Sequence, residues 1–234
     1  MEKIDIDNAI ADTCIRIIKE PLLYFSETDV QQMLTAELKL IKGLGDLYPT
    51  LIHRGKDSKS FYSTTLLHRE YGGGGGTRID IVIFSKEDVE KIDNQNLKTG
   101  NKYITPEFAF ELGTEKTLNI KEHLDNDINK LKNVKKTGYI IHIYKDITKS
   151  PSGTKSREAT IGRITEIFKN VFEDNSKNCP NEKVKKLAIL LNPFKNQTKT
   201  WGKCEIFDGT TCKWEKVNVD KKNELKKKIL EQLK

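Results

Sequence analysis

The chain has 234 residues, which suits one domain or one domain with an elaboration. A hydrophobic content of 36% can support a core, and no apolar run is long enough to span a membrane, which argues against an integral membrane protein. The acidic, mixed start of the chain does not resemble a signal peptide, so we expect a soluble cytoplasmic protein. The formal charge of +7 suits a polyanionic partner such as DNA, although a charge of this size also serves solubility alone.

Two amphipathic helices are expected near the start of the chain. Residues 7–20 place apolar side chains at helical spacing, and a proline follows them. A second helix, over about 26–42, opens with a capping box that begins at Ser26. Glu27 and Gln31 lie one turn apart on this helix, so both can face one site, although a glutamate in a first turn also compensates the helix dipole.

A hairpin of two strands follows. Residues 61–71 are predicted to form one strand that contains Glu70, and residues 78–84 form the next. The glycines at 72–76 between them are not a phosphate-binding loop, because no Gly-Lys-Ser/Thr follows. In the second strand the alternation of side chains places Asp80 on the face opposite the isoleucines.

A third strand and a basic helix come next, after a polar segment at 85–103 that is either a loop or a short helix. Residues 106–112 alternate, with Glu111 opposite a face of phenylalanines and leucine. A helix over about 119–132 has a buried apolar stripe, and its other face is rich in lysine. That face carries Lys121, Lys130 and Lys132.

Strands and helices continue to alternate to the end of the chain. The segments expected there are a strand buried on both faces (138–144), a flexible basic loop (149–156), a helix (157–174), a strand (186–191), a hairpin (203–219) and a basic amphipathic helix (221–234). This order predicts an α/β fold on a mixed sheet.

The cysteines and histidines form no zinc or catalytic-triad pattern. We expect free thiols in a reducing compartment, with a disulfide between Cys204 and Cys212 as the alternative. The histidines are scattered in sequence, at His53, His68, His123 and His142.

Asp80 and Glu111 are the candidate chemistry. Each carboxylate is flanked by β-branched or aromatic residues, and burying it is costly unless something pairs with it. Two carboxylates on adjacent strands repel each other, and a divalent cation removes that repulsion; oxygen ligands favour Mg²⁺ or Mn²⁺. The alternative is a plain ion pair with Arg78 or Lys116.

The order helix, three strands, helix, strand, together with Glu27, Asp80 and Glu111, resembles the core of the PD-(D/E)XK nuclease superfamily. The resemblance covers about residues 22–145. It implies a restriction-endonuclease-like αβββαβ core with a mixed central sheet flanked by helices, over about residues 22–192. A hairpin and helix at 195–234 would be a C-terminal elaboration of the same domain.

One position departs from the family pattern. The lysine of the family's Glu-x-Lys motif falls at Gly113. Lys116, just downstream, is the first candidate to replace it, and Lys121 on the next helix is the second.

The resemblance also implies roles for the remaining candidates. Asp80, Glu111 and the backbone carbonyl of Leu112 would hold Mg²⁺, with Glu27 binding it directly or through water. Lys116 would steer the attacking hydroxide. Glu70 would be a further or supporting ligand, and Gln31 would hydrogen-bond the water or a ligand. Phosphate contacts are expected from Arg54, Lys56, Arg69, Lys121 and the 149–157 loop.

The sequence therefore predicts a Mg²⁺-dependent DNA endonuclease in restriction, defence or repair, with homodimerisation as a route to cutting both strands. The first alternative is a DNA-binding module of the same fold that has lost cleavage, which the glycine at 113 motivates. The second is an α/β interaction protein that is not a nuclease.

Overall fold

The computed structural model describes residues 2–21, 24, 26–53, 61–72, 78–93, 104–114, 120–145, 162, 166–167, 169–170, 183–192, 203–211 and 213–234. Within these ranges the chain is an α/β protein with a mixed seven-stranded sheet, in the order β3-β4-β5-β6-β7-β8-β9. The pairs β5–β6 and β6–β7 are parallel and the other four are antiparallel. The strands are β3 Leu67–Gly72, β4 Arg78–Ile83, β5 Phe108–Gly113, β6 Thr137–Lys145, β7 Val184–Asn192, β8 Lys203–Asp208 and β9 Lys213–Val217.

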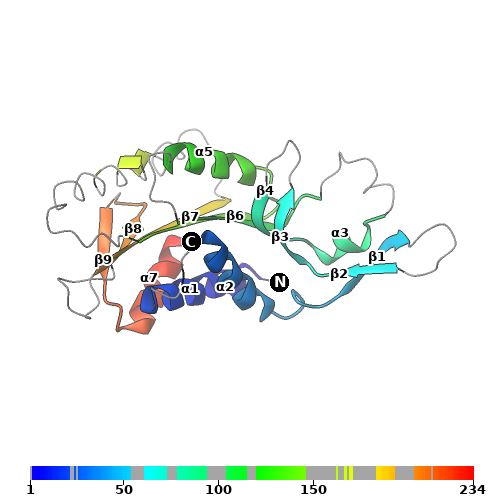
Figure 1. Ribbon diagram of the computed structural model, residues 1–234, viewed down its shortest axis with the longest axis horizontal. Helices are drawn as coiled ribbons and strands as arrows, with labels where there is room; N and C mark the ends of the chain where they lie inside the picture. Colours follow the sequence, from blue (N-terminus) through cyan, green and yellow to red (C-terminus); the bar gives the residue numbers. More distant parts are fainter. Residues whose placement is uncertain are drawn as a thin grey trace.

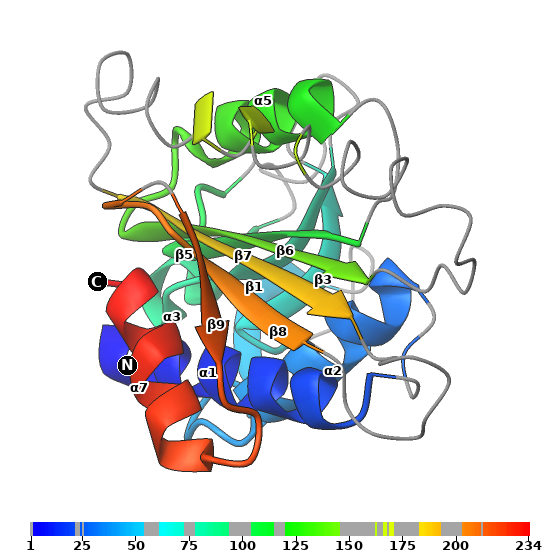
Figure 2. The same ribbon diagram turned by 90° about the vertical axis from the view of Figure 1, so that its left-hand side faces the viewer.

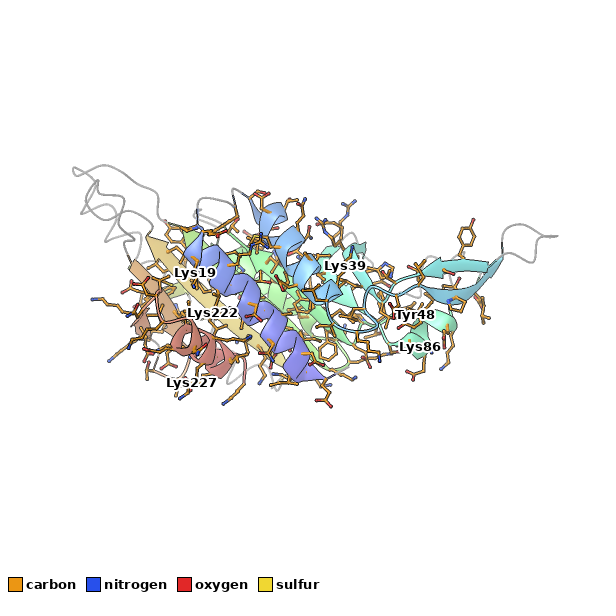
Figure 3. All side chains as sticks on the ribbon, turned by 90° about the horizontal axis from the view of Figure 1, so that it is seen from below. Lys19, Lys39, Tyr48, Lys86, Lys222 and Lys227 are labelled. Atoms are coloured by element: carbon orange, nitrogen blue, oxygen red, sulfur yellow. The ribbon has the colours of Figure 1, made fainter. Side chains whose placement is uncertain are left out.

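Helices cover both faces of this sheet. Figure 1 places α1 (Lys3–Lys19), α2 (Glu27–Lys39) and α7 (Lys222–Gln232) on one face, and α5 (Ile120–Leu131) on the other. Figure 2 shows the same layers from the side, after a turn of 90° about the vertical axis. Figure 3, a view from below, shows α1 crossing the sheet, where it contacts α2 and α7. The buried residues are continuous from the helices into the central strands, so a single core forms.

The two predicted N-terminal helices are confirmed. The first begins at Lys3, a turn earlier than the periodicity suggested. The capping box at the start of α2 is formed on both sides, since Ser26 and the Asp29 carboxylate each accept from the other's backbone N–H. This cap fixes the first turn of α2 and therefore the position of Gln31, in the next turn, relative to the sheet.

The prediction of one strand over 61–71 is wrong. The segment divides into β2 (Phe61–Thr64) and β3, because the Thr65 hydroxyl donates to the Leu67 carbonyl and bends the chain between them. β2 pairs with β1 (Tyr48–His53), which the sequence did not reveal, in a separate two-stranded sheet.

That small sheet lies at one end of the molecule beside α3 (Lys86–Glu90), so of the two alternatives for 85–103, a loop or a short helix, the described part contains a short helix (Figure 1). The Lys86 ammonium lies 5.7 Å from the centroid of the Tyr48 ring, and Figure 3 labels both side chains.

The later strands and helices agree with the sequence predictions. The β6 strand is buried on both faces, β8 and β9 form the expected hairpin, and α7 buries Leu225, Ile229 and Leu233. Cys14 and Cys204 are buried free thiols, so the disulfide alternative is not formed. The basic loop at 149–156 lies outside the described residues, as does most of the helix expected at 157–174. Among the helices that the structure describes, none is long and apolar enough to cross a membrane.

A glycine lets α5 pack closely on the sheet. A Cβ atom built on Gly138 of β6 would lie 2.9 Å from the Cβ atom of Leu131, which is closer than real Cβ contacts. Since Leu124, Ile128 and Leu131 are all buried, α5 is held against the sheet by the apolar stripe that the sequence predicted. The polar stripe beside it is thereby brought over β5 and β6.

Candidate active site

The site forms where the β4–β5 ladder ends. The last backbone pair of this ladder is Ile81 with Phe110, and the Leu112 N–H, two residues farther along β5, donates instead to Oδ2 of Asp80 at 2.7 Å. Phe110 faces α1, since its ring stacks on Tyr139, so the alternation of β5 turns Glu111 toward α5. Asp80 and Glu111 are therefore neighbours across adjacent strands, as the sequence predicted.

Glu111 is buried with one oxygen paired and one unpaired. The residue is 1% exposed, and its Oε2 accepts a hydrogen bond from Nζ of Lys130 at 2.9 Å. Its Oε1 is buried and has no hydrogen-bond partner in the described part of the chain. Lys130, which the sequence placed on the lysine-rich face of this helix, turns its ammonium inward to the carboxylate.

Asp127 holds the same ammonium from the helix side. Its Oδ1 accepts from Lys130 Nζ at 3.1 Å, and the side chain is 0% exposed. Its Oδ2 lies 3.5 Å from Nε2 of His123 and 3.5 Å from Nε2 of His142. The two histidines that are distant in sequence thus meet at one carboxylate oxygen, with ring centroids 5.8 Å apart.

Sequence reasoning did not assign Asp127, Lys130, His123 or His142 to the site. A signal was present on α5, since residues 123, 127 and 130 follow the i, i+4, i+7 spacing of one helical stripe. No comparable signal exists for His142, because only the pairing of β5 with β6 places it there.

Gly113 is explained by the same arrangement. It is the partner of His142 in the parallel β5–β6 ladder, and a Cβ atom built on it would overlap the His142 ring. The family's lysine at this position would need His142 to move. The lack of a side chain at 113 therefore leaves room for the His142 ring, whose Nε2 lies 3.5 Å from Oδ2 of Asp127.

Three carboxyl groups form an acidic cluster, which we define as Asp80, Glu111 and Asp127, and in the described part of the chain Lys130 contacts the last two of them. Burial, reinforced by Asp127 and Asp80, raises the pKa of Glu111 to about 9. Burial also raises the pKa of Asp80, against the opposing effects of the Leu112 N–H and Lys130. One proton is therefore retained within the cluster near neutral pH when no further cation is present.

Asp127 and Lys130 are the charged members. Although burial works to raise the pKa of Asp127, the nearby His142, His123 and Lys130 hold it below its ordinary value. Burial works to lower the pKa of Lys130, but Glu111 and Asp127 raise it, so the ammonium keeps its charge.

A second network ties α2 to the edge of the sheet through Gln31, which is buried. Its Nε2 donates to Oε1 of Glu70 and to the Asp80 carbonyl, both at 2.9 Å. Its Oε1 accepts from Nε and Nη2 of Arg69, at 3.2 and 2.5 Å. Gln31 thus supports the strand that carries Asp80, and Arg69, expected to bind phosphate, is exposed but engaged with this amide.

Glu70 has an unusual backbone. Its φ of 52° lies in the left-handed region, where a non-glycine residue is strained. The β3–β4 ladder pairs Arg69 with Ile81 and Tyr71 with Ile79, and omits the pair between them, Glu70 with Asp80. The Glu70 carboxylate is directed to Gln31, with Arg78 at 3.9 Å from its other oxygen.

The remaining candidates lie farther out or beyond the described residues. Glu27 is the half-buried first residue of α2, one turn before Gln31. Lys121 is exposed in the first turn of α5, and it is Lys130 that contacts Glu111. Lys116, Arg54 and Lys56 lie outside the described residues.

The donor set fits a cation held by two carboxylates. Within the described ranges, no three His, Cys, Asp or Glu side chains are placed to hold a metal ion. Asp80 and Glu111 nevertheless supply carboxylate oxygens, and no described residue hydrogen-bonds to the buried Oε1 of Glu111. Since Mg²⁺ is often bound through one or two carboxylates and keeps several waters, the cluster suits it.

Comparison with models of protein families, with curated protein sequences and with solved structures found no match to this chain.

Proposed function

We propose that this chain is a divalent-metal-dependent DNA endonuclease of the PD-(D/E)XK type, which hydrolyses phosphodiester bonds. The observation that carries the proposal is the charge of the acidic cluster. Among the residues that the structure describes, Glu111 and Asp127 are buried beside the half-buried Asp80, Lys130 is the one lysine that contacts them, and Oε1 of Glu111 has no hydrogen-bond partner. An excess of buried carboxylates over cations is costly in a fold that needs no cation there.

The mixed sheet adds support to this proposal. It has helices on both faces and follows the expected order around the site, from α2 through β3, β4 and β5 to α5 and β6. The wider arrangement of the restriction-endonuclease-like fold is part of the proposal.

Asp80 and Glu111 would hold Mg²⁺ or Mn²⁺, with the Leu112 carbonyl and Glu27 as further oxygen donors. When bound, the cation supplies positive charge that lowers the pKa of water and offsets charge on the phosphate. The chain's own contribution is orientation. The Asp80 carboxylate is fixed by the Leu112 N–H, and the strand behind it is fixed by Gln31.

Lys130 takes the role that the sequence suggested for Lys116. Its ammonium already donates to Glu111 and Asp127, so its third N–H is placed to donate to an attacking water or to a phosphate oxygen. A lysine that reaches the site from α5 compensates for the glycine at 113.

DNA is proposed as the substrate on the net charge of +7 and on this site chemistry. Arg69, Lys121, Arg54 and Lys56 are the proposed phosphate contacts. Cutting of both strands would use a homodimer, and restriction, defence or repair is the setting proposed for the reaction.

Cleavage of supercoiled plasmid tests the proposal. Wild type would be compared with Asp80→Ala, Glu111→Ala and Lys130→Met in Mg²⁺, Mn²⁺ or EDTA, on DNA from several sources. Lys132→Met is the matched control, because that exposed lysine directly follows the last residue of α5 and contacts none of the three carboxylates in the described part of the chain. We expect metal-dependent cutting that Asp80→Ala and Glu111→Ala abolish, that Lys130→Met slows strongly and that the control retains.

Two other outcomes would contradict the nuclease. DNA binding that weakens steeply with salt, without cutting of any DNA, would favour the binding module that has lost cleavage. Absence of both cutting and salt-dependent binding would favour an interaction protein.

A further inference from the structure

The carboxylate of Asp127 is placed between a lysine on one side and two histidines on the other. Its two oxygens are used separately, since Oδ1 contacts Lys130 while Oδ2 faces His123 and His142. Full burial removes it from water, so it cannot exchange these neighbours for solvent. A carboxylate in this position fixes the ammonium more tightly than an exposed one would.

Lys130 would be poorly fixed without this support. A lysine side chain is long and rotates freely, and Glu111 alone contacts the ammonium through one oxygen. With Asp127 the ammonium has two anchors, at 2.9 and 3.1 Å, from different elements. The second anchor comes from the same helix, three residues away, and restricts the direction in which the side chain extends.

His142 depends in turn on Gly113. The imidazole occupies the space that a side chain at 113 would fill, and from there its Nε2 reaches Asp127. A side chain at 113 would require this ring to move from its present position. The glycine and the histidine are therefore a complementary pair.

We propose that Asp127 is a positioning residue that holds the Lys130 ammonium against Glu111, and that Gly113 is required because His142 completes the packing around Asp127. The catalytic consequence rests on the proposed nuclease function, whereas the coupling of these residues does not. Asp127 acts through Lys130 and does not itself contact the substrate.

The coupling is measured first by unfolding, which needs no activity. Asp127→Asn, Lys130→Met and the double variant form a thermodynamic cycle in the full chain, with Asp127→Asn and Lys132→Met as the control cycle. If Asp127 holds Lys130, the shifts in midpoint are non-additive in the first cycle and additive in the control. Additive shifts in both cycles would overturn the positioning role.

The second test introduces a lysine at position 113, where the family pattern has one. Gly113→Lys alone is expected to lower the thermal midpoint by about 5 °C or more, and His142→Ala in the same chain is expected to restore most of that loss. If Gly113→Lys is tolerated without the second change, the proposed complementarity is wrong.

Cleavage then tests the catalytic consequence. Lys130→Met is expected to slow cutting on the order of 10²–10³-fold and Asp127→Asn about 10–100-fold. Asp127→Asn should have no further effect once Lys130 is methionine. Gly113→Lys with His142→Ala should restore at least about tenfold to the Lys130→Met protein, which a merely structural Asp127–His142 contact would not predict.

The two proposals can fail separately. A wild-type protein that never cuts DNA contradicts the nuclease, while the unfolding cycle and the exchange at 113 still decide the positioning role. Independent effects of Asp127→Asn and Lys130→Met on cutting by an active wild type contradict the positioning role alone.

Discussion

The two faces of the central sheet each bury a carboxylate, and they treat it differently. On the α1 face, Asp7 accepts from Lys3 through one oxygen, at 2.5 Å, and from the Tyr139 hydroxyl through the other, at 2.7 Å. On the α5 face, Glu111 has one oxygen on Lys130 and the other without a described partner. The first carboxylate is fully satisfied, and the second lies in a cluster with too few cations.

We relate the satisfied carboxylate to stability and the unsatisfied one to function. A satisfied buried polar group joins α1 to β6 and strengthens the fold. An unsatisfied one lowers stability and persists where a ligand completes it. The comparison predicts that substitutions on the α1 face change stability, and that substitutions in the acidic cluster change activity.

The largest effect is expected for Glu111→Gln. Cleavage should fall roughly a thousandfold, because about 4 kcal/mol of charge stabilisation in the transition state is lost with the carboxylate. Folding should not suffer, since glutamine is neutral and close in shape to the protonated carboxyl group that Glu111 keeps near neutral pH in the metal-free protein. Plasmid cleavage and thermal unfolding of the same preparation check both parts, and a variant that cuts normally would contradict the assignment.

The stability of the metal-free protein should also depend on pH through Glu111. Its pKa rises from 4.5 to about 9 on folding, so the folded chain keeps a proton that the unfolded chain loses in this range. Stability should therefore fall as pH rises from about 4.5 to 9, by an amount on the order of a few kcal/mol. Asp80 acts in the same direction, since its pKa is also raised.

Urea unfolding at a series of pH values in EDTA measures this slope. The control is Glu111→Gln, which keeps Asp80 and should flatten the dependence. If the unfolding free energy depended on pH equally in the two proteins, a group other than Glu111 would hold the extra proton of the folded state.

Asp7→Ala tests the satisfied carboxylate on the other face. It should cost about 2–3 kcal/mol of unfolding free energy, because the Lys3 and Tyr139 donors lose a charged acceptor. Denaturant unfolding measures the loss, and Asp5→Ala, at an exposed position on the same helix, should cost less than about 1 kcal/mol. Cutting by the folded fraction should be unchanged; a selective loss of cutting would contradict the division between the faces.

Gly138→Ala tests how closely α5 must approach. The added methyl group would press on Leu131, and we expect a loss of about 1–3 kcal/mol. Cutting should fall as well, because α5 carries Lys130. Gly45→Ala, whose Cβ would meet only ordinary contact at 3.6 Å, is the control. A fall in both the thermal midpoint and the cleavage rate would indicate that the methyl group displaces α5. No change in either would indicate that the methyl group is tolerated.

The smallest effect concerns the backbone of Glu70. Glycine tolerates a φ of 52° and alanine does not, so Glu70→Gly should be more stable than Glu70→Ala by about 0.5–1 kcal/mol. The same pair of substitutions at Arg69 should show the opposite order, since a strand residue with ordinary φ gains nothing from glycine. Unfolding midpoints of the four variants decide the point.

Much of the fold was predictable because local patterns report local structure. The capping box at Ser26 and the apolar stripes of α5 and α7 identify helices, and the alternation around Asp80 and Glu111 identifies strands and their faces. The division of 61–71 into two strands was not predictable, because a single side-chain bond from Thr65 separates segments of similar composition.

By itself, the sequence determined the α/β character of the chain and the carboxylates that could carry chemistry, since both follow from side-chain periodicity along each segment. Tertiary structure decided which lysine contacts these carboxylates. Lys130 is one of several on a basic helix, and only the close packing of α5 at Gly138 brings its ammonium to Glu111. His142 and Gly113 are distant in sequence and meet because parallel strands pair, a contact that no local pattern encodes.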